Sequence, residues 1–309
     1  MKNNEVFEGV VTPMVTPFDD KGAIDRCALR KLIDHLVSGG VKGIFLMGTT
    51  GEGASMTVEM QHELITLAVE YTAGRTAVLV HVADSCLERS IALANFAAEA
   101  GVNYAVSALP YYFSLTQEEI FDFYTRLADA IKLPLFLYNI PAQTKMMMAP
   151  ETVCRLASHP NIIGMKDSSG NGTYFNTLLA TVKPAHPDFS IMVGPDEMLA
   201  STMAVGGNGG VNSGSNLFPE LYVALYEACR KADKDRIMAL QALVMKVSTD
   251  IYSPDGTPVS FMKGLKAALT SLGIISNCVL PPLHPAGAEV SAEIAVKTKE
   301  IQTELAGLL

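Results

Sequence analysis

The stretch that decides the fold is LPLFLYNIPAQTKMMMAPETVCRLASHPNIIGMKDSSGN, residues 133–171. It begins with one short apolar run, residues 133–139, and contains a second, residues 161–166. Continuous apolar runs of this length are typical of strands that are covered on both faces. Between them, Pro150 suits the first position of a helix that we expect to end near Ser158. Strand, helix and strand in this order predict a parallel βαβ unit.

The same unit recurs along the chain. Apolar runs of strand length alternate with helical patterns, and they span residues 9–15, 41–48, 77–82, 103–109, 133–139, 161–166, 190–194 and 207–213. The last run is the weakest and depends on its place in the series. Eight strands alternating with helices in about 220 residues predict an α/β fold of the (β/α)8 TIM-barrel type. An open doubly wound sheet is the alternative, but it usually carries a glycine-rich fingerprint after its first strand, which this sequence lacks.

Capping patterns predict where several of the intervening helices begin. Thr57 is placed to cap one helix. Ser85 and Glu88 have the spacing of a capping box, in which each side chain bonds the backbone amide of the other, and so do Thr116 and Glu119. We therefore expect helices to start at these three points, each after an apolar run.

The pattern changes after Pro219, from alternating strands and helices to helices alone. Helical periodicity covers three segments there, 219–231, 233–252 and 258–273, and a last helix follows the loop at 281–287. We therefore expect a (β/α)8 barrel over residues 1–225 and a C-terminal helical extension over residues 226–309. The extension should pack on the barrel, so that the chain forms one structural unit.

Composition and charge exclude several classes of function. The chain has 309 residues, of which 49% are hydrophobic and 18% charged, and its formal net charge is −9. No cluster of Lys and Arg is present, so we expect no nucleic-acid partner. The sequence contains no run of 18 apolar residues, the length needed to span a membrane. Its N-terminus lacks the basic and apolar regions of a signal peptide. These features predict a cytoplasmic protein.

Cysteine and histidine spacing suggests neither a disulfide nor a metal site. The five cysteines are widely separated and contain no CxxC pair, and the six histidines form no HxH or HExxH motif. We therefore expect no metal. His81 is flanked by apolar residues and is expected to be a hydrogen-bonded histidine of the core.

Polar residues follow several predicted strands at the point where each strand ends. In a barrel of this type the active site forms at the C-terminal ends of the strands. The segments expected there are GTTGEG (48–53), PYY (110–112), YNIPAQT (138–144), KD (166–167) and GPDE (194–197). One lysine and three tyrosines should therefore lie at the same face of the barrel.

Lys166 is the most informative of these residues. Most lysines are solvated, but the apolar residues before Lys166 predict that it is buried. A buried amine loses its proton more readily, and a neutral amine attacks carbonyl groups to form a Schiff base. The alternative is a structural ion pair with Asp167 or with a nearby glutamate.

Hydroxyl groups near such an amine could move protons. Tyr138 could serve as a proton shuttle, with Thr49 and Tyr112 extending the relay, although a core packing role is equally consistent with Tyr138. The loop 48–53 is rich in backbone N–H groups and could hold a small anion such as a carboxylate. Glu52 in this loop could fix the turn or form an outward ion pair.

Together these motifs resemble one known family. GTTGEG after the second strand, PYY after the fourth, YNIPAQT at the fifth and GMKD at the sixth are similar to the dihydrodipicolinate synthase/N-acetylneuraminate lyase family. The resemblance extends from about residue 7 to residue 285, with the motifs in the same order and spacing. It implies a (β/α)8 barrel with a helical C-terminal extension, a class I aldolase or related lyase activity, and a homotetramer built as a dimer of dimers.

The resemblance also implies roles for individual residues. Lys166 would form an imine with pyruvate or with a 2-oxo acid that releases it, and no metal or organic cofactor would be needed. Tyr138 would be the acid/base group, and Tyr112 would complete its relay across a subunit contact. The remaining site residues would bind substrate: Gly48, Thr49 and Thr50 at the carboxylate, Gln143 at the second substrate, and Gly194 and Val211 along the lysine's pocket.

Gln143 departs from the pattern of the true synthases. They carry an arginine at this position, which binds the carboxylate of the aldehyde substrate. A glutamine lacks the charged, bidentate fork that suits a carboxylate. The sequence therefore favours a neutral aldehyde.

These features together predict a Schiff-base lyase that reversibly cleaves a 4-hydroxy-2-oxo acid of the 2-keto-3-deoxy sugar acid type to pyruvate and an aldehyde. One alternative is 4-hydroxy-tetrahydrodipicolinate synthase, which condenses pyruvate with aspartate semialdehyde. Another is a 4-hydroxy-2-oxoglutarate aldolase. A more remote alternative is a barrel that binds a 2-oxo acid without catalysis, because a fold alone never establishes an activity.

Overall fold

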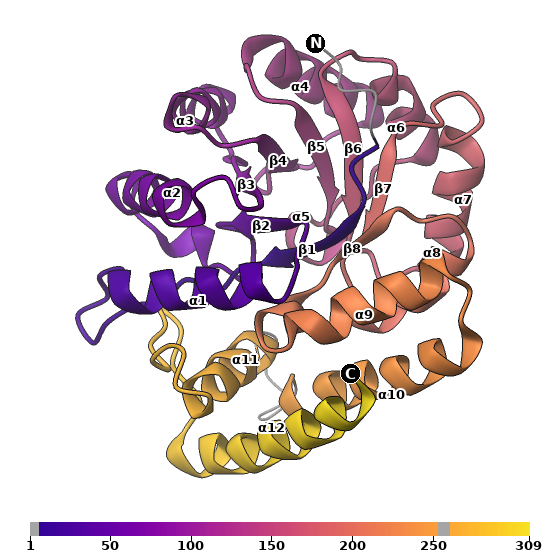
Figure 1. Ribbon diagram of the computed structural model, residues 1–309. Helices are drawn as coiled ribbons and strands as arrows, with labels where there is room; N and C mark the ends of the chain where they lie inside the picture. Colours follow the sequence, from indigo (N-terminus) through magenta and orange to yellow (C-terminus); the bar gives the residue numbers. More distant parts are fainter. Residues whose placement is uncertain (1–5, 253–259) are drawn as a thin grey trace.

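The structure is a computed structural model that describes residues 6–252 and 260–309, and its centre is a closed barrel of eight parallel strands (Figure 1). The strands are β1 (Gly9–Pro13), β2 (Gly43–Leu46), β3 (Ala77–His81), β4 (Tyr104–Ala108), β5 (Leu135–Asn139), β6 (Ile162–Asp167), β7 (Ser190–Val193) and β8 (Gly209–Val211). Each strand pairs with the next in the chain, and β8 pairs with β1. All eight predicted strands are present, so the predicted (β/α)8 barrel is confirmed.

Helices follow every strand and surround the barrel (Figure 1). They are α1 (Arg26–Ser38), α2 (Val58–Thr72), α3 (Leu87–Ala100), α4 (Gln117–Ala130), α5 (Pro141–Thr144), α6 (Pro150–Ala157), α7 (Gly172–Val182), α8 (Leu199–Ala204) and α9 (Pro219–Arg230). Short 3-10 turns, η1 (Gly53–Ser55), η2 (Asp196–Met198) and η3 (Ser213–Asn216), lie in the segments that follow β2, β7 and β8. These turns lie at the C-terminal ends of their strands, where the active site was expected.

Two of the three predicted helix caps are confirmed. The Thr57 hydroxyl accepts the Met60 N–H at 3.3 Å, and the side chains of Thr116 and Glu119 form a complete capping box. The predicted cap at Ser85 is wrong, because α3 begins after Cys86 and its N-cap makes no side-chain hydrogen bond. The Asp84 carboxylate closes that turn instead, by accepting the Cys86 N–H at 2.7 Å.

Buried side chains form two separate clusters. The larger one lies between the strands and the surrounding helices, and the smaller one fills the interior of the barrel. At the N-terminal end of the interior, the Phe7 ring lies edge-on against Tyr104 and Phe136, with ring centroids 4.9 Å and 5.4 Å away. These aromatic rings pack that end of the barrel, which favours entry of a ligand from the opposite end.

The C-terminal extension consists of α10 (Lys234–Ile251), α11 (Ser260–Ser271) and α12 (Ala288–Leu308). Figure 1 shows the three helices together on one side of the barrel, where α10 packs against both α9 and α12. Positions 258 and 259 of the predicted helix 258–273 lie outside the described residues. The boundary predicted at residue 225 falls inside α9, and the division of the chain there stays a prediction. Among the described helices, none combines the length and the apolar character needed to cross a membrane.

Candidate active site

Lys166 and Tyr138 are neighbours across two hydrogen-bonded strands. Their Cα atoms are register partners on β6 and β5, so both side chains point to the same side of the sheet, into the barrel. Both are buried, with 7% of Lys166 and 3% of Tyr138 exposed. The Lys166 Nζ lies 4.3 Å from the centroid of the Tyr138 ring and 5.2 Å from that of Phe45. The structure therefore brings together the predicted amine and the predicted phenol.

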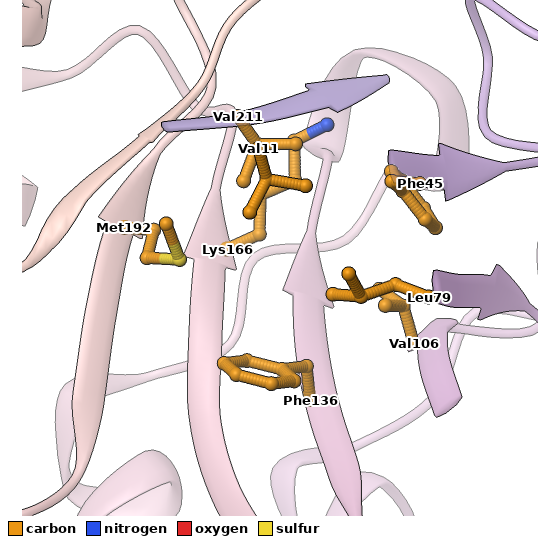
Figure 2. Close-up of a pocket in the computed structure, with 8 residues that line it drawn as sticks. All are labelled: Val11, Phe45, Leu79, Val106, Phe136, Lys166, Met192 and Val211. Carbon is orange, nitrogen blue, oxygen red and sulfur yellow. The ribbon is translucent and has the colours of Figure 1, made fainter. Parts of the chain in front are cut away.

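An apolar pocket surrounds the Lys166 side chain. Each of the eight strands contributes one residue to its wall: Val11, Phe45, Leu79, Val106, Phe136, Lys166, Met192 and Val211. Figure 2 shows Lys166 extending from β6 beside Val11 and Val211, with its nitrogen at the end of the pocket away from Phe136. Lys166 is the one ionisable residue in this wall, so its amine is where the chemistry of the pocket can take place.

The alternative role for Lys166, an ion pair with Asp167, does not occur. Within the described residues no hydrogen bond or ion pair involves the Lys166 amine. The Asp167 carboxylate accepts instead from the Asn139 amide at 2.8 Å and from the Ser169 hydroxyl at 2.9 Å. Burial raises the pKa of Asp167, and these hydrogen bonds oppose the rise. The amine thus remains available to a ligand, while its neighbour helps to fix the loop after β6.

His81, at the end of β3, lies beside the same phenol. Its ring is edge-on to Tyr138, with centroids 5.9 Å apart, and its Nε2 accepts the Ala108 N–H at 3.4 Å. Burial and then the nearby charge of Lys166 lower the pKa of His81 to about 4, against an opposing hydrogen bond to the Met47 carbonyl. The predicted hydrogen-bonded histidine is confirmed, and near neutral pH it carries no charge. Its contact with Tyr138 was not predicted.

The loop after β2, residues 48–53, is fixed from two neighbouring strand ends. The Thr16 hydroxyl, after β1, donates to the Gly51 carbonyl at 2.8 Å. The Thr50 hydroxyl lies 3.1 Å from that of Ser213, after β8. At Gly53 a Cβ atom would lie 2.0 Å from the Met47 carbonyl oxygen, so no side chain fits there. The loop after β2 is therefore held by residues that follow β1 and β8, and its binding of an anion stays a prediction.

The sequence matches the dihydrodipicolinate synthetase family over residues 6–301. The chain belongs to this family. Family aldolases join pyruvate to a lysine as a covalent Schiff base and use no separate cofactor, and the chain is an enzyme of this lyase class.

Relatives within the family have more than one activity in their names. The chain is 32% identical over 292 residues to the probable 2-dehydro-3-deoxy-D-pentonate aldolase YjhH of Escherichia coli (strain K12), covering 94% of this chain and 96% of the relative. A solved dihydrodipicolinate synthase from Bacteroides thetaiotaomicron has a TM-score of 0.92 and 41% identity, covering 95% and 98% of the two chains. YagE from E. coli K12, solved in complex with pyruvate, has a TM-score of 0.91 and 29% identity, covering 96% and 99%. The family is thus fixed, and the individual reaction is not.

The other residues that the family resemblance singled out differ in their surroundings. Val211 lines the pocket, and Gly48 is buried against the Phe45 ring. The Gly194 N–H donates to the Asp167 carbonyl at 2.7 Å, which joins β7 to the end of β6. Of these three positions, Val211 shares the pocket wall with Lys166, and the roles of all three toward a substrate stay predictions.

Tyr112 and Gln143 lie outside this pocket wall. The Tyr112 side chain is 76% exposed, and the ring contact described for it is with Phe113, at 5.0 Å between centroids. Gln143 is exposed on the one-turn helix α5. Within one chain the structure therefore does not bring Tyr112 to Lys166, and its relay across a subunit contact stays a prediction.

Glu52 and Lys266 are the residues near the site that the sequence did not connect. Glu52 was expected to fix the turn or to pair outward, but its side chain is buried and forms an ion pair with Lys266 of α11. The outward pairing is therefore wrong. Lys266 lies within the apolar helical pattern of α11, and no motif there signals a buried charge. The signal in the sequence that pointed towards this ion pair was the acidic residue Glu52 within the glycine-rich loop 48–53.

Proposed function

We propose that the protein is a class I aldolase in which Lys166 forms the imine and Tyr138 moves the protons. The substrate is a 4-hydroxy-2-oxo acid of the 2-keto-3-deoxy sugar acid type, which is cleaved reversibly to pyruvate and an aldehyde. The observation that supports this proposal is the unpaired amine of Lys166 in an apolar pocket, 4.3 Å from the Tyr138 ring. Such a site suits carbonyl chemistry because it holds in place an amine that has no competing partner among the described residues, and an amine is a nucleophile for carbonyl groups when it is unprotonated.

The proposed reaction begins when the Lys166 amine adds to the C2 ketone and water leaves, which gives a protonated imine. The departing water takes up the phenolic proton of Tyr138. The resulting phenolate then takes the proton from the C4 hydroxyl as the C3–C4 bond breaks. The electron pair of that bond moves into the imine, so the aldehyde departs and an enamine remains. A proton returns to C3, and water hydrolyses the imine to pyruvate and free Lys166.

The substrate carboxylate would lie at the loop after β2. Backbone N–H groups from Gly48 to Thr50 and the hydroxyls of Thr49 and Thr50 are the donors that we assign to it. The short distance between Thr50 and Ser213 supports this assignment, because it keeps one hydroxyl in place before a ligand arrives. Gly194 and Val211 complete the surroundings of the imine.

In this proposal, the residues around Gln143 determine which aldehyde the enzyme accepts as its second substrate. Because a neutral amide replaces a charged fork there, we propose a hydroxylated aldehyde without a carboxylate at that end. The competing function is 4-hydroxy-tetrahydrodipicolinate synthase with aspartate semialdehyde, which the 41% identity to the Bacteroides thetaiotaomicron enzyme favours. A 4-hydroxy-2-oxoglutarate aldolase is a third candidate.

We also propose that the protein is a cytoplasmic homotetramer, built as a dimer of dimers. Three consecutive aromatic residues after β4, Tyr111, Tyr112 and Phe113, are 63%, 76% and 72% exposed. Large exposed apolar side chains in a row are typical of a surface that a second subunit covers. Analytical ultracentrifugation of the wild type and of Tyr112→Ser would test the assembly.

Borohydride reduction in the presence of pyruvate, followed by peptide mass spectrometry, tests the mechanism. We expect a reduced pyruvyl adduct on Lys166, and absence of the adduct would contradict the proposal. A screen for pyruvate release over several 4-hydroxy-2-oxo acids, with aspartate semialdehyde condensation measured in parallel, tests the substrate. Efficient condensation with the semialdehyde would overturn our interpretation of Gln143. Turnover that is lost in Lys166→Ala would exclude a barrel that only binds the acid.

A further inference from the structure

The Glu52–Lys266 ion pair joins the loop after β2 to the C-terminal extension. It connects residues 214 positions apart in the sequence, and both side chains are buried, 1% and 0% exposed. The Lys266 amine also donates to the Cys278 carbonyl at 2.6 Å. The second oxygen of the Glu52 carboxylate accepts the Leu280 N–H at 2.8 Å. The Glu52 carboxylate is thus bonded both to Lys266 of α11 and to the segment that follows α11.

A charged pair is an unusual choice for this location. Burial lowers the pKa of Lys266, and the attraction of Glu52 opposes that effect. Apolar residues of similar size often pack a buried site as stably as an ion pair, so stability alone is weak grounds for keeping two charges there. The ion pair instead fixes the orientation of the Glu52 and Lys266 side chains, because hydrogen bonds are directional and apolar contacts are not. A requirement for exact orientation is expected where a loop must present donors to a ligand.

The backbone of Glu52 shows that the loop depends on outside contacts. Its φ of 58° lies in the left-handed region, which non-glycine residues rarely adopt. Such a conformation persists when the surrounding structure holds it in place. Glu52 lies two residues after Thr50, whose hydroxyl and amide are assigned to the substrate carboxylate. A shift of the Glu52 side chain would therefore move the donors of the carboxylate site.

We propose that Glu52 and Lys266 are a positioning pair that fixes the loop 48–53 for binding the carboxylate of the 2-oxo acid, so that the C-terminal extension is a working part of the site. This inference rests on the proposed function, since it takes a 2-oxo acid as the ligand. Neither residue lines the pocket, so the pair acts through Thr49 and Thr50. The simpler alternative is that the pair only attaches the extension to the barrel.

The double variant Glu52→Gln/Lys266→Met separates the two alternatives. It removes both charges together, so no unpaired charge is left in the core, and the introduced glutamine side chain keeps an oxygen for the Leu280 N–H. We expect a folded protein in which the pyruvate concentration for half-maximal borohydride trapping rises at least tenfold. The adduct formed at saturating pyruvate should match the wild type, because Lys166 is untouched. Glu52→Gln alone is the second variant, because its amide oxygen can still accept from the Lys266 amine, and we expect it to raise the half-maximal pyruvate concentration in the same direction.

Ser276→Ala is the matched control. The Ser276 hydroxyl donates to the Phe18 carbonyl at 2.5 Å and so also joins the extension to the barrel, through a hydrogen bond that does not involve the loop 48–53. If the pair only attaches the extension, the control and the double variant should change pyruvate binding equally. If the pair positions the loop, the control should leave the half-maximal concentration unchanged.

Hydrogen exchange of the ligand-free proteins provides a second measurement. In the double variant we expect amides 48–53 to exchange faster than in the wild type, while amides of β7 keep their protection. Unchanged pyruvate binding in a folded double variant would overturn the inference, and so would unchanged exchange in the loop. If the wild type forms no adduct, the proposed function fails, and the exchange data then decide separately whether the pair fixes the loop.

Discussion

The two buried lysines, Lys166 and Lys266, have opposite surroundings. Lys266 is fully buried, and its amine is bonded to the Glu52 carboxylate and the Cys278 carbonyl. Lys166 is 7% exposed, and its amine faces the rings of Phe45 and Tyr138 with no partner among the described residues. A lysine with partners is part of the framework, whereas a buried lysine without them is available for chemistry. The difference agrees with the positioning role proposed for Lys266 and with the catalytic role proposed for Lys166.

Lys166→Met should have the largest effect on activity. Without the amine no imine can form, so we expect pyruvate release and borohydride trapping to fall to the detection limit. Stability should change little or rise slightly, because methionine fills an apolar wall and leaves no polar partner behind. Activity assays and thermal unfolding of the same preparation check both expectations. A large loss of stability would remove the contrast between the two lysines.

Tyr138→Phe should have the next largest effect. Removal of a positioned acid/base group lowers the catalytic rate by about 100- to 10 000-fold. The ring and its contacts with Phe45 and His81 are kept, so folding should be unaffected. Steady-state kinetics, with borohydride trapping to confirm that Lys166 still reacts, is the appropriate measurement. A variant with an unchanged kcat would show that another group moves the protons.

Lys266→Met should give the opposite result from Lys166→Met. It leaves the Glu52 carboxylate buried without a counter-charge, which we expect to cost about 3–5 kcal/mol of unfolding free energy. Denaturant unfolding of the two methionine variants, side by side, is the measurement. Equal losses from both substitutions would mean that the ion pair adds nothing beyond ordinary packing.

His81 should make stability depend on pH in the mildly acidic range. Its folded pKa of about 4 lies below the ordinary value of 6.5, so between these values the unfolded chain binds a proton that the folded chain does not. The stabilisation is complete above pH 6.5 and should be lost as the pH falls through 4, by about 3 kcal/mol. Denaturant unfolding at several pH values checks this. In His81→Gln this loss of unfolding free energy between pH 6.5 and 4 should disappear. If the variant still shows the loss, other groups cause it.

The smallest expected effect connects His81 to the unpaired lysine. The charge of Lys166 contributes to the lowered pKa of His81, after burial. In Lys166→Met the pKa of His81 should therefore rise above about 4 and stay below 6.5, since burial is unchanged. NMR titration of the imidazole in the two proteins measures the change. Lys266→Met, whose amine is not among the causes of the shift, is the control and should leave the titration as in the wild type.

Much of the fold and the centre of the site could be predicted because their signals are local. Near-continuous apolar runs marked most of the strands, the last strand was predicted from its place in the series, and an amine at the end of an apolar run marked Lys166. Tyr138 followed from the same rule on the neighbouring strand. The failure at Ser85 was also local, because the Asp84 carboxylate took the amide at the start of that turn. Competition between two nearby acceptors cannot be judged from spacing alone.

The residues that sequence reasoning missed depend on distant contacts. Lys266 follows the helical pattern of α11, and nothing near it indicates that it meets a carboxylate from the loop after β2. The contact of His81 with Tyr138 likewise depends on how β3 and β5 face each other across the barrel. Tyr112 is exposed in the single chain, so its partner cannot be read from that chain's fold. Closure of the barrel brings His81 to Tyr138, and packing of the extension on the barrel brings Lys266 to Glu52.

The pairing of β5 with β6 has a consequence for how this enzyme could be redesigned. Tyr138 and Lys166 are register partners, so ladder hydrogen bonds between adjacent strands, about 4.8 Å apart, set the spacing of phenol and amine. Gln143 and Tyr112, in contrast, belong to segments beyond the strand ends. Segments carrying new aldehyde preferences could therefore be grafted onto the barrel while the two reacting groups keep their separation. The paired strands would fix the two reacting groups, and the segments beyond the strand ends could be exchanged independently of them.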